Sequence, residues 1–276
     1  MTTIGMGVVR TAAAGSSGWL WRNRHAILAF VLLFVIWEFL AWLLALPAYL
    51  LPRPSLIASD LMDRWPRVLE GAWVTTSEIV FGYLLAVAIS VPLAFLVAYS
   101  PFFEKSVYPL IVFLQIVPKI AIAPLFIIWF GFGFMPKLLL VFLLSFFPIV
   151  VSSTAGFKSV DPDVMDLARS TGAGAWRLFA KIRLPQALPD IFTGLKVGAA
   201  LAATAAVVAE FVASNKGLGY LLLEYNGNLE TPMVFAVIIV LSLIGLAIYY
   251  AVEFLERITI PWHVSQRSAK GGVPMV

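Results

Sequence analysis

The sequence predicts an all-α protein whose helices cross a membrane six times, and two observations carry this prediction. First, hydrophobic residues make up 61% of the 276 residues and charged residues only 12%, whereas soluble domains average about 45–50% apolar and about 25% charged residues. Second, six apolar runs approach or exceed the roughly 20 residues that a helix needs to cross a bilayer. The expected spans are 27–47, 74–99, 107–131, 135–156, 189–213 and 231–256.

The first span follows a short basic stretch that contains Arg22, Arg24 and His25. This arrangement resembles the start of a signal peptide, but the apolar run is too long for one and no clean small-residue cleavage site follows it. We therefore expect 27–47 to be an uncleaved spanning helix that follows a cytoplasmic tail at 1–26.

The next two segments carry less regular patterns. The polar stretch 48–73 predicts a short amphipathic helix on the outer surface. The third span contains Pro109, Pro118 and Pro124. Because proline removes a backbone donor and clashes with the preceding turn, we expect this span to be kinked or broken, with its freed backbone groups facing protein or water.

The distribution of basic residues orients the chain. An even number of spans places both termini on one side, and lysine and arginine gather on the cytoplasmic side of membrane proteins. With both termini cytoplasmic, the outer side holds only Arg53, Arg64, Arg67, Lys137 and Lys216, while Lys119 lies within a span. We therefore predict that the loop 157–188 and the tail 257–276 are cytoplasmic.

The loop 157–188 predicts two short amphipathic helices. The first begins near Asp163, the turn is Gly172-Ala173-Gly174, and the second covers 175–183. Trp176, Phe179 and Ile182 share one side of the second helix, and Pro185 and Pro189 are expected to end it. Taken alone, the pattern fits a helix pair resting on the membrane surface and equally a helix that inserts aromatic anchors into a partner protein.

The spacing within this loop resembles a known family. Asp166-Leu167-Ala168, three residues, Gly172, nine residues and Ile182-Arg183-Leu184-Pro185 resemble the EAA loop of ABC-transporter permeases, which reads E-A-A, three residues, G, nine residues, I-x-L-P. Asp166 and Leu167 replace the usual glutamate and first alanine. The resemblance implies that 165–180 is a coupling helix seated in a cleft of an ATPase subunit. The residues implied in coupling are Asp166, Ala168, Gly172, Trp176, Phe179, Ile182, Leu184 and Pro185.

A second block points to one branch of this family. The runs 117–125 and 127–133 resemble the nitrate, taurine and aliphatic-sulfonate branch of binding-protein-dependent permeases, and so do Ser145-Phe146-Phe147-Pro148, Gly156, Ala209-Glu210 and Gly217-Leu218-Gly219. The resemblance covers about residues 50–256. It implies a type I ABC importer permease fold in a bacterial inner membrane, a second copy of the permease, ATPase subunits, and a periplasmic or lipid-anchored substrate-binding protein. It leaves the solute open among sulfonate, nitrate, aromatic acids and vitamin precursors.

Ionisable residues inside spans are candidates for function because a charge in the bilayer is costly. They are Glu38, Glu78, Lys119, Lys196 and Glu210. We expect a structural pairing for Glu38, a helix-end position for Glu78 and a snorkelling side chain for Lys196. Lys119, Gln115 and Glu210 are the candidates for lining a pathway, although a hydrogen bond between helices also explains Glu210. Gly194 and Gly198 have the spacing that lets helices approach closely.

The sequence lacks the residues that several classes of function require. The chain has no cysteine, and its two histidines lie near opposite ends, so we expect no metal site. It has no P-loop and no nucleophile with a base, so we expect no cofactor, no enzymatic activity of its own, and ATP bound by a partner. The net charge of +4 fits cytoplasmic basic residues at a lipid surface better than nucleic acid. The alternative is a secondary transporter or channel, which would need a coupling-ion site and usually internal repeats.

Overall fold

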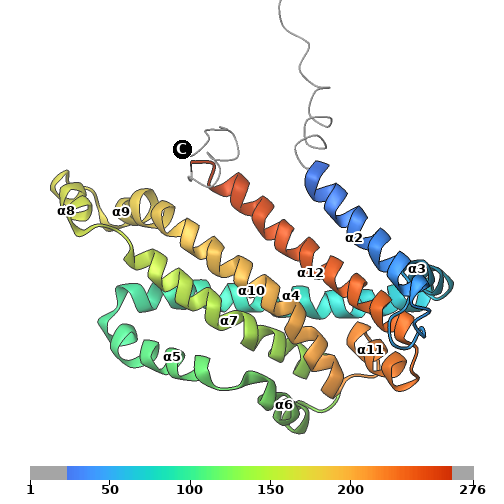
Figure 1. Cartoon of the computed structure of the whole chain (residues 1–276). Coiled ribbons are helices and arrows are strands. Elements are labelled where there is room, and N and C mark those ends of the chain that lie inside the picture. The colour runs from blue at the N-terminus through green and yellow to red at the C-terminus, as the bar shows by residue number, and fades with distance from the viewer. Residues whose placement is uncertain (1–23, 263–276) are drawn as a thin grey trace, which may run out of the picture.

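The computed structural model describes residues 24–262, so most of the two predicted tails lies outside the described residues. Every regular element in this range is helical, which confirms the all-α prediction (Figure 1). The helices are α2 (Arg24–Leu43), α3 (Pro54–Asp63), α4 (Trp65–Tyr99), η1 (Phe103–Val107), α5 (Tyr108–Ile116), η2 (Lys119–Ile122), α6 (Ala123–Phe130), α7 (Phe134–Lys158), α8 (Pro162–Ser170), α9 (Ala175–Leu178), η3 (Phe179–Arg183), α10 (Leu184–Ala213), α11 (Leu218–Gly227) and α12 (Thr231–Thr259).

Four helical stretches of this range are long and apolar enough to cross a membrane: Trp65–Tyr99, Phe134–Lys158, Ala175–Val212 and Thr231–Thr259. A bent pair, Phe103–Ile116 with Lys119–Phe130, makes a fifth candidate. In α2, only the shorter apolar helix Val31–Leu43 is found. The chain is therefore a polytopic membrane protein with four to five candidate spans in the described residues.

The third span is broken, as its prolines predict. Helix α5 ends at Ile116, and the chain turns by 88° before it continues as η2 and α6. Figure 1 shows α5 and α6 below the main bundle, at an angle to each other. Pro118 stands at the break with an extended backbone, which is the conformation that proline permits and a helix interior does not.

Helices α4, α7 and α10 form the centre of the bundle, and small residues let α7 and α10 approach closely. A Cβ atom added at Gly194 would lie 2.8 Å from Cβ of Ser152, and one at Gly198 would lie 2.9 Å from Cδ1 of Ile149. Both distances are too short for non-bonded carbons, so the predicted close packing at Gly194 and Gly198 is confirmed.

The segment 48–73 differs from its prediction. A surface helix is present as α3, but α4 begins at Trp65 rather than at 74, so much of the expected loop is its first turns. Arg67 lies on these turns and pairs with Glu224 of α11 at 2.7 Å, with its guanidinium 5.9 Å from the centre of the Tyr225 ring. The helix continues past its apolar run because its polar residues find partners on α11.

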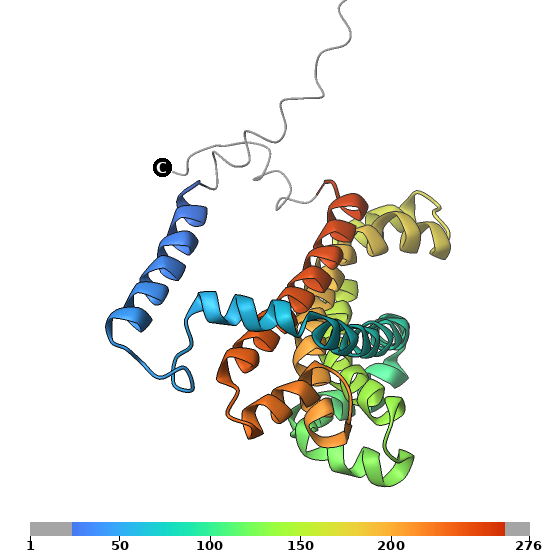
Figure 2. The same cartoon turned by 90° about the vertical axis from the view of Figure 1, so that its right-hand side faces the viewer.

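Helix α2 stands apart from the rest of the bundle (Figure 2). Its described apolar side chains are largely exposed, for example Leu32 at 59% and Trp42 at 60%. The expected structural pairing of Glu38 is present: its carboxylate accepts hydrogen bonds from Ser55 N at 3.0 Å and Ser55 Oγ at 2.7 Å. This contact ties the end of α2 to α3.

Candidate functional site

The loop 157–188 forms the two predicted helices, at the end of the bundle where α4 and α7 finish (Figure 1). Asp161 caps α8 by accepting a hydrogen bond from Asp163 N at 2.8 Å, and Pro162 occupies the first turn, where its missing donor costs nothing. The turn after α8 depends on Gly172, whose φ of +75° is strained for other residues. The N–H of Gly172 donates to Arg169 O at 3.0 Å.

The prediction that Pro185 and Pro189 end the second helix is wrong. Helix α9 passes through the wide turn η3 directly into α10, and Ala175–Val212 is one continuous stretch of 38 residues. In η3 the N–H of Leu184 reaches back to Phe179 O, which shifts the hydrogen-bond pattern just before Pro185. A wide turn of this kind accommodates the proline ring without ending the helix.

The two predicted aromatic anchors differ in exposure, although their ring centres are 5.7 Å apart. Trp176 is 75% exposed. Phe179, by contrast, turns into the bundle, where its ring centre lies 5.0 Å from that of Phe95 and 6.4 Å from that of Phe157. Trp176 is therefore available to a partner, while Phe179 joins the loop to α4 and α7.

The remaining loop residues divide in the same way. Met165 and Leu178 are buried at 5% and 7% exposure and hold α8 and α9 in place. Asp166 is exposed and pairs with Arg169 at 3.1 Å. Partly buried positions are Ala168, Ile182, Leu184 and Pro185. The loop thus presents polar side chains together with Trp176 and Leu167 on its outer surface, above a short apolar base.

The three candidates for a pathway do not lie together. Lys119 sits at the break of the third span, where its ammonium donates to Gln115 O and lies 4.7 Å from the centre of the Phe147 ring. Gln115 is exposed one turn earlier. Glu210 is buried, at 1% exposure, in a different group of residues.

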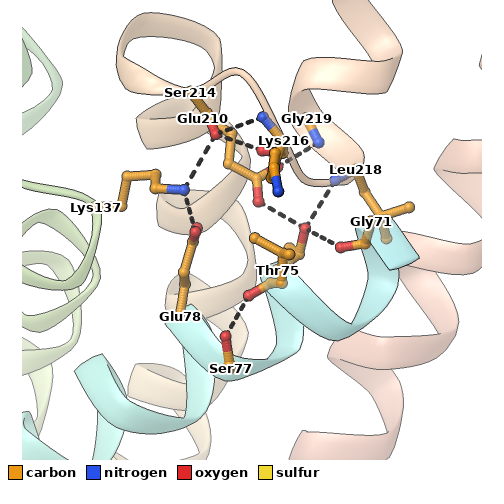
Figure 3. A network of polar contacts seen from close by, with 11 residues as sticks. Gly71, Thr75, Ser77, Glu78, Lys137, Glu210, Ser214, Lys216, Leu218 and Gly219 are labelled. Atoms are coloured by element: carbon orange, nitrogen blue, oxygen red, sulfur yellow. Dashed lines mark hydrogen bonds and ion pairs between the residues drawn. The ribbon is translucent and has the colours of Figure 1, made fainter. Parts of the chain in front are cut away.

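That group is a buried polar network that the sequence analysis missed. Lys137, assigned above to the outer side, lies within α7 at 5% exposure and forms an ion pair with Glu78, which is fully buried in α4 (Figure 3). Glu78 therefore does not lie at a helix end. Glu210 Oε1 lies 2.6 Å from Thr75 Oγ1, within hydrogen-bond distance, and Oε2 accepts a hydrogen bond from Gly219 N. Lys137 falls inside the predicted span 135–156, and a charge at such a position is the signal that could have revealed the network.

Lys196 is also paired rather than snorkelling freely. Its ammonium lies 2.7 Å from a carboxylate oxygen of Glu256 on α12, and the Glu256 side chain is only 8% exposed. This ion pair joins α10 to α12. Within residues 24–262 no group of three or more histidine, cysteine, aspartate or glutamate side chains could hold a metal ion.

Three curated relatives match most of the chain. The formylaminopyrimidine transport permease protein ThiX of Halalkalibacterium halodurans is 36% identical over 87% of this chain and 96% of its own length. The riboflavin transport system permease protein RibX of Chloroflexus aurantiacus is 35% identical over 85% of this chain and 88% of its own. The taurine transport system permease protein TauC of Escherichia coli is 32% identical over 84% and 87%.

A solved structure and a family model agree with these relatives. A chain from an inward-facing structure of the MetNI methionine ABC transporter superposes with a TM-score of 0.60 at 15% identity, over 71% of this chain and 97% of its own, which supports the fold. The model described as "binding-protein-dependent transport system inner membrane component" matches residues 79–260. The chain therefore belongs to the binding-protein-dependent inner-membrane permeases of ABC transporters.

Proposed function

We propose that two copies of this permease form a pathway for a small polar solute and expose it alternately to the two sides of the inner membrane. Membership of the family means that a separate subunit binds ATP and that a binding protein supplies the solute. The self-sufficient transporter or channel considered above belongs to a different class. The observation that carries the proposal is the loop 157–188, which presents an exposed tryptophan on a helix continuous with a span.

The loop is the proposed contact with the ATPase. Residues 165–174 lie outside the candidate spans and residues 175–180 form the first turns of the stretch Ala175–Val212. Trp176 and Leu167 are exposed at 75% and 70%. Large apolar side chains in such positions are the usual anchors of an interface. Movement of the ATPase subunits would act on α8 and α9, and Phe179 would pass it to α4 and α7 through its ring contacts.

A second copy and the membrane are the proposed neighbours of the exposed apolar faces. Helix α2 has few contacts with its own chain beyond α3 and the contact of Trp37 with Phe235, whose ring centres are 5.7 Å apart. With α2 as a sixth span, both termini lie on the same side of the membrane. We propose that this side is the cytoplasm, which then holds the segments 1–26 and 257–276. The transmembrane permease domain then covers 27–256.

Orientation can be tested with single cysteines, since the chain has none of its own. Ser170 in the coupling loop and Asn226 on α11 are both exposed. In intact cells an impermeant thiol reagent should label a cysteine at Asn226 and spare one at Ser170, and both should react in inverted vesicles. Labelling at Ser170 but not at Asn226 in intact cells would reverse the proposed topology.

The solute is proposed to be an anion or an acceptor-rich heterocycle. The names of three relatives refer to a formylaminopyrimidine, riboflavin and taurine. These three solutes are all rich in hydrogen-bond acceptors. Among residues 24–262 no carboxylate lies within ion-pair distance of Lys119. A cation without a counter-ion at the break of the third span is suited to meeting such a solute.

Lys119→Gln should lower uptake of the solute retained by the cognate binding protein by roughly ten- to a hundredfold, because a hydrogen bond from a charged donor contributes about 1.5–3 kcal/mol. Uptake and membrane abundance are measured together in reconstituted vesicles. Arg257→Gln is the control, since that side chain is exposed and pairs with Glu253 one turn away, where such pairs contribute little. Equal uptake by both variants would mean that Lys119 does not contact the solute in the pathway.

A further inference from the structure

Three ionisable side chains of the network in Figure 3 are buried, namely two carboxyl groups and one ammonium group. Glu78 of α4 is 0% exposed, Glu210 of α10 is 1% exposed and Lys137 of α7 is 5% exposed. Lys137 pairs with Glu78 and also donates to Ser214 Oγ at 3.1 Å. Within the part of the chain that the structure describes, no lysine or arginine lies within ion-pair distance of Glu210.

The charges of this group do not balance. If all three residues were ionised, the site would carry one uncompensated negative charge away from water. The charged residues that line the adjoining pocket are Arg67 and Glu70 of α4 and Lys216 of the link before α11, and all three are exposed. Arg67 is already paired with Glu224. Since α11 offers only backbone N–H groups here, a buried carboxylate without a cation would cost more than keeping its proton.

The hydrogen bonds around Thr75 point to the place of that proton. The Thr75 hydroxyl has one hydrogen, but two acceptors lie within reach: Gly71 O at 3.1 Å and Glu210 Oε1 at 2.6 Å. The same hydroxyl oxygen accepts a hydrogen bond from Leu218 N at 2.8 Å. If Glu210 carries a hydrogen, it donates to Thr75, Thr75 donates to Gly71, and every one of these contacts has its own hydrogen.

We propose that Glu210 is a neutral carboxylic acid that binds one proton and fastens the start of α11 to α4 and α10. Its other oxygen accepts from Gly219 N. The link closes tightly around it: a Cβ atom at Gly217 would overlap the carboxyl oxygens, and one at Gly219 would lie 2.8 Å from Oε2. The Gly217-Leu218-Gly219 run is thus shaped to hold this acid. The proposal concerns the architecture of the outer half and does not depend on the identity of the solute.

Loss of the proton would place a second carboxylate charge beside Glu78 and remove the donor to Thr75. The folded chain retains the proton, whereas in an unfolded chain Glu210 releases it once the pH exceeds the ordinary pKa of a glutamate. The folded state then binds more protons, so its stability falls as pH rises. The unfolding equilibrium constant should increase by up to tenfold per pH unit until Glu210 ionises in the folded state.

The test compares two isosteric variants, Glu210→Gln and Glu78→Gln, in the full chain purified with its ATPase. The amide in Glu210→Gln can donate to Thr75 and accept from Gly219 as the neutral acid does, so this variant should keep the wild-type melting temperature at neutral pH and lose the dependence on alkaline pH. Glu78→Gln separates Lys137 from its carboxylate and should melt at a clearly lower temperature. Infrared spectra should show a protonated carboxyl band in the wild type that Glu210→Gln lacks.

Three results would overturn the proposal. The first is a lower melting temperature for Glu210→Gln than for Glu78→Gln, since that would make Glu210 the ionised partner of Lys137. The second is the same pH dependence in Glu210→Gln as in the wild type. The third is a wild-type melting temperature that rises with sodium concentration at constant pH but not with choline concentration. A bound metal cation would then supply the missing positive charge.

Discussion

Gly172→Pro should reduce solute uptake to background while leaving the protein inserted in the membrane at normal abundance. The φ of +75° at Gly172 is inaccessible to proline, whose ring holds φ near −65°. The substitution also removes the hydrogen bond from Gly172 N to Arg169 O. Helices α8 and α9 would separate, while the spans, whose packing lies elsewhere, would remain. Uptake and abundance are measured in the same membranes.

Gly174 supplies a control two residues away. Its φ of −67° is ordinary, and a Cβ atom there would meet nothing within 4 Å. Gly174→Ala should therefore retain uptake, while Gly172→Ala, which must adopt an unfavourable left-handed backbone at a cost of about 1 kcal/mol, should lie between the two. Normal uptake by Gly172→Pro at normal abundance would mean that the turn has no part in coupling.

Trp176→Ala should weaken association with the ATPase by about 30-fold, because an exposed aromatic anchor contributes on the order of 2 kcal/mol when it is central to an interface. Trp176 is 75% exposed, so its removal should leave the melting temperature of the isolated permease unchanged. Co-purification of the ATPase with tagged permease gives the first measure, and the ATP-dependent uptake of the assembled complex gives the second.

Two variants separate docking from folding. Trp73→Ala removes an equally exposed tryptophan, at 77%, from α4 near the opposite end of the bundle and should leave ATPase binding intact. Phe179→Ala should lower the melting temperature itself, because Phe179 packs against Phe95, Tyr99 and Phe157. If Trp176→Ala co-purifies with the ATPase as well as Trp73→Ala does, the docking surface lies elsewhere on the loop.

Local signals in the sequence predicted the parts of the fold that local chemistry decides. The prolines at 109, 118 and 124 correctly indicated a broken third span, and the Gly172 turn between two short helices was found at its place. The apolar runs located most of the spans. The end of the second loop helix was wrong because Pro185 follows a wide turn, and neither composition nor periodicity indicates where a helix changes its hydrogen-bond pattern.

The buried network was beyond such reasoning because its members come from distant parts of the chain. Thr75 and Glu210 are 135 residues apart, and Lys137 and Ser214 are 77 apart. A single sequence shows each as an isolated polar residue in an apolar run. Only the packing of α4, α7 and α10 brings them together, although the rule that charges inside spans seek partners could have grouped Glu78, Lys137 and Glu210 as a hypothesis.

The continuous helix from Ala175 to Val212 has a mechanical consequence. Its 38 residues extend over about 57 Å at about 1.5 Å per residue, from the loop 157–188 at one end to Glu210 at the other. It can therefore act as a lever: a tilt of about 5° at the loop would displace the opposite end by about 5 Å at this length. Such a displacement exceeds the reach of the hydrogen bonds that join Glu210 to Thr75 and Gly219, so the far end must either carry α4 and α11 with it or part from them.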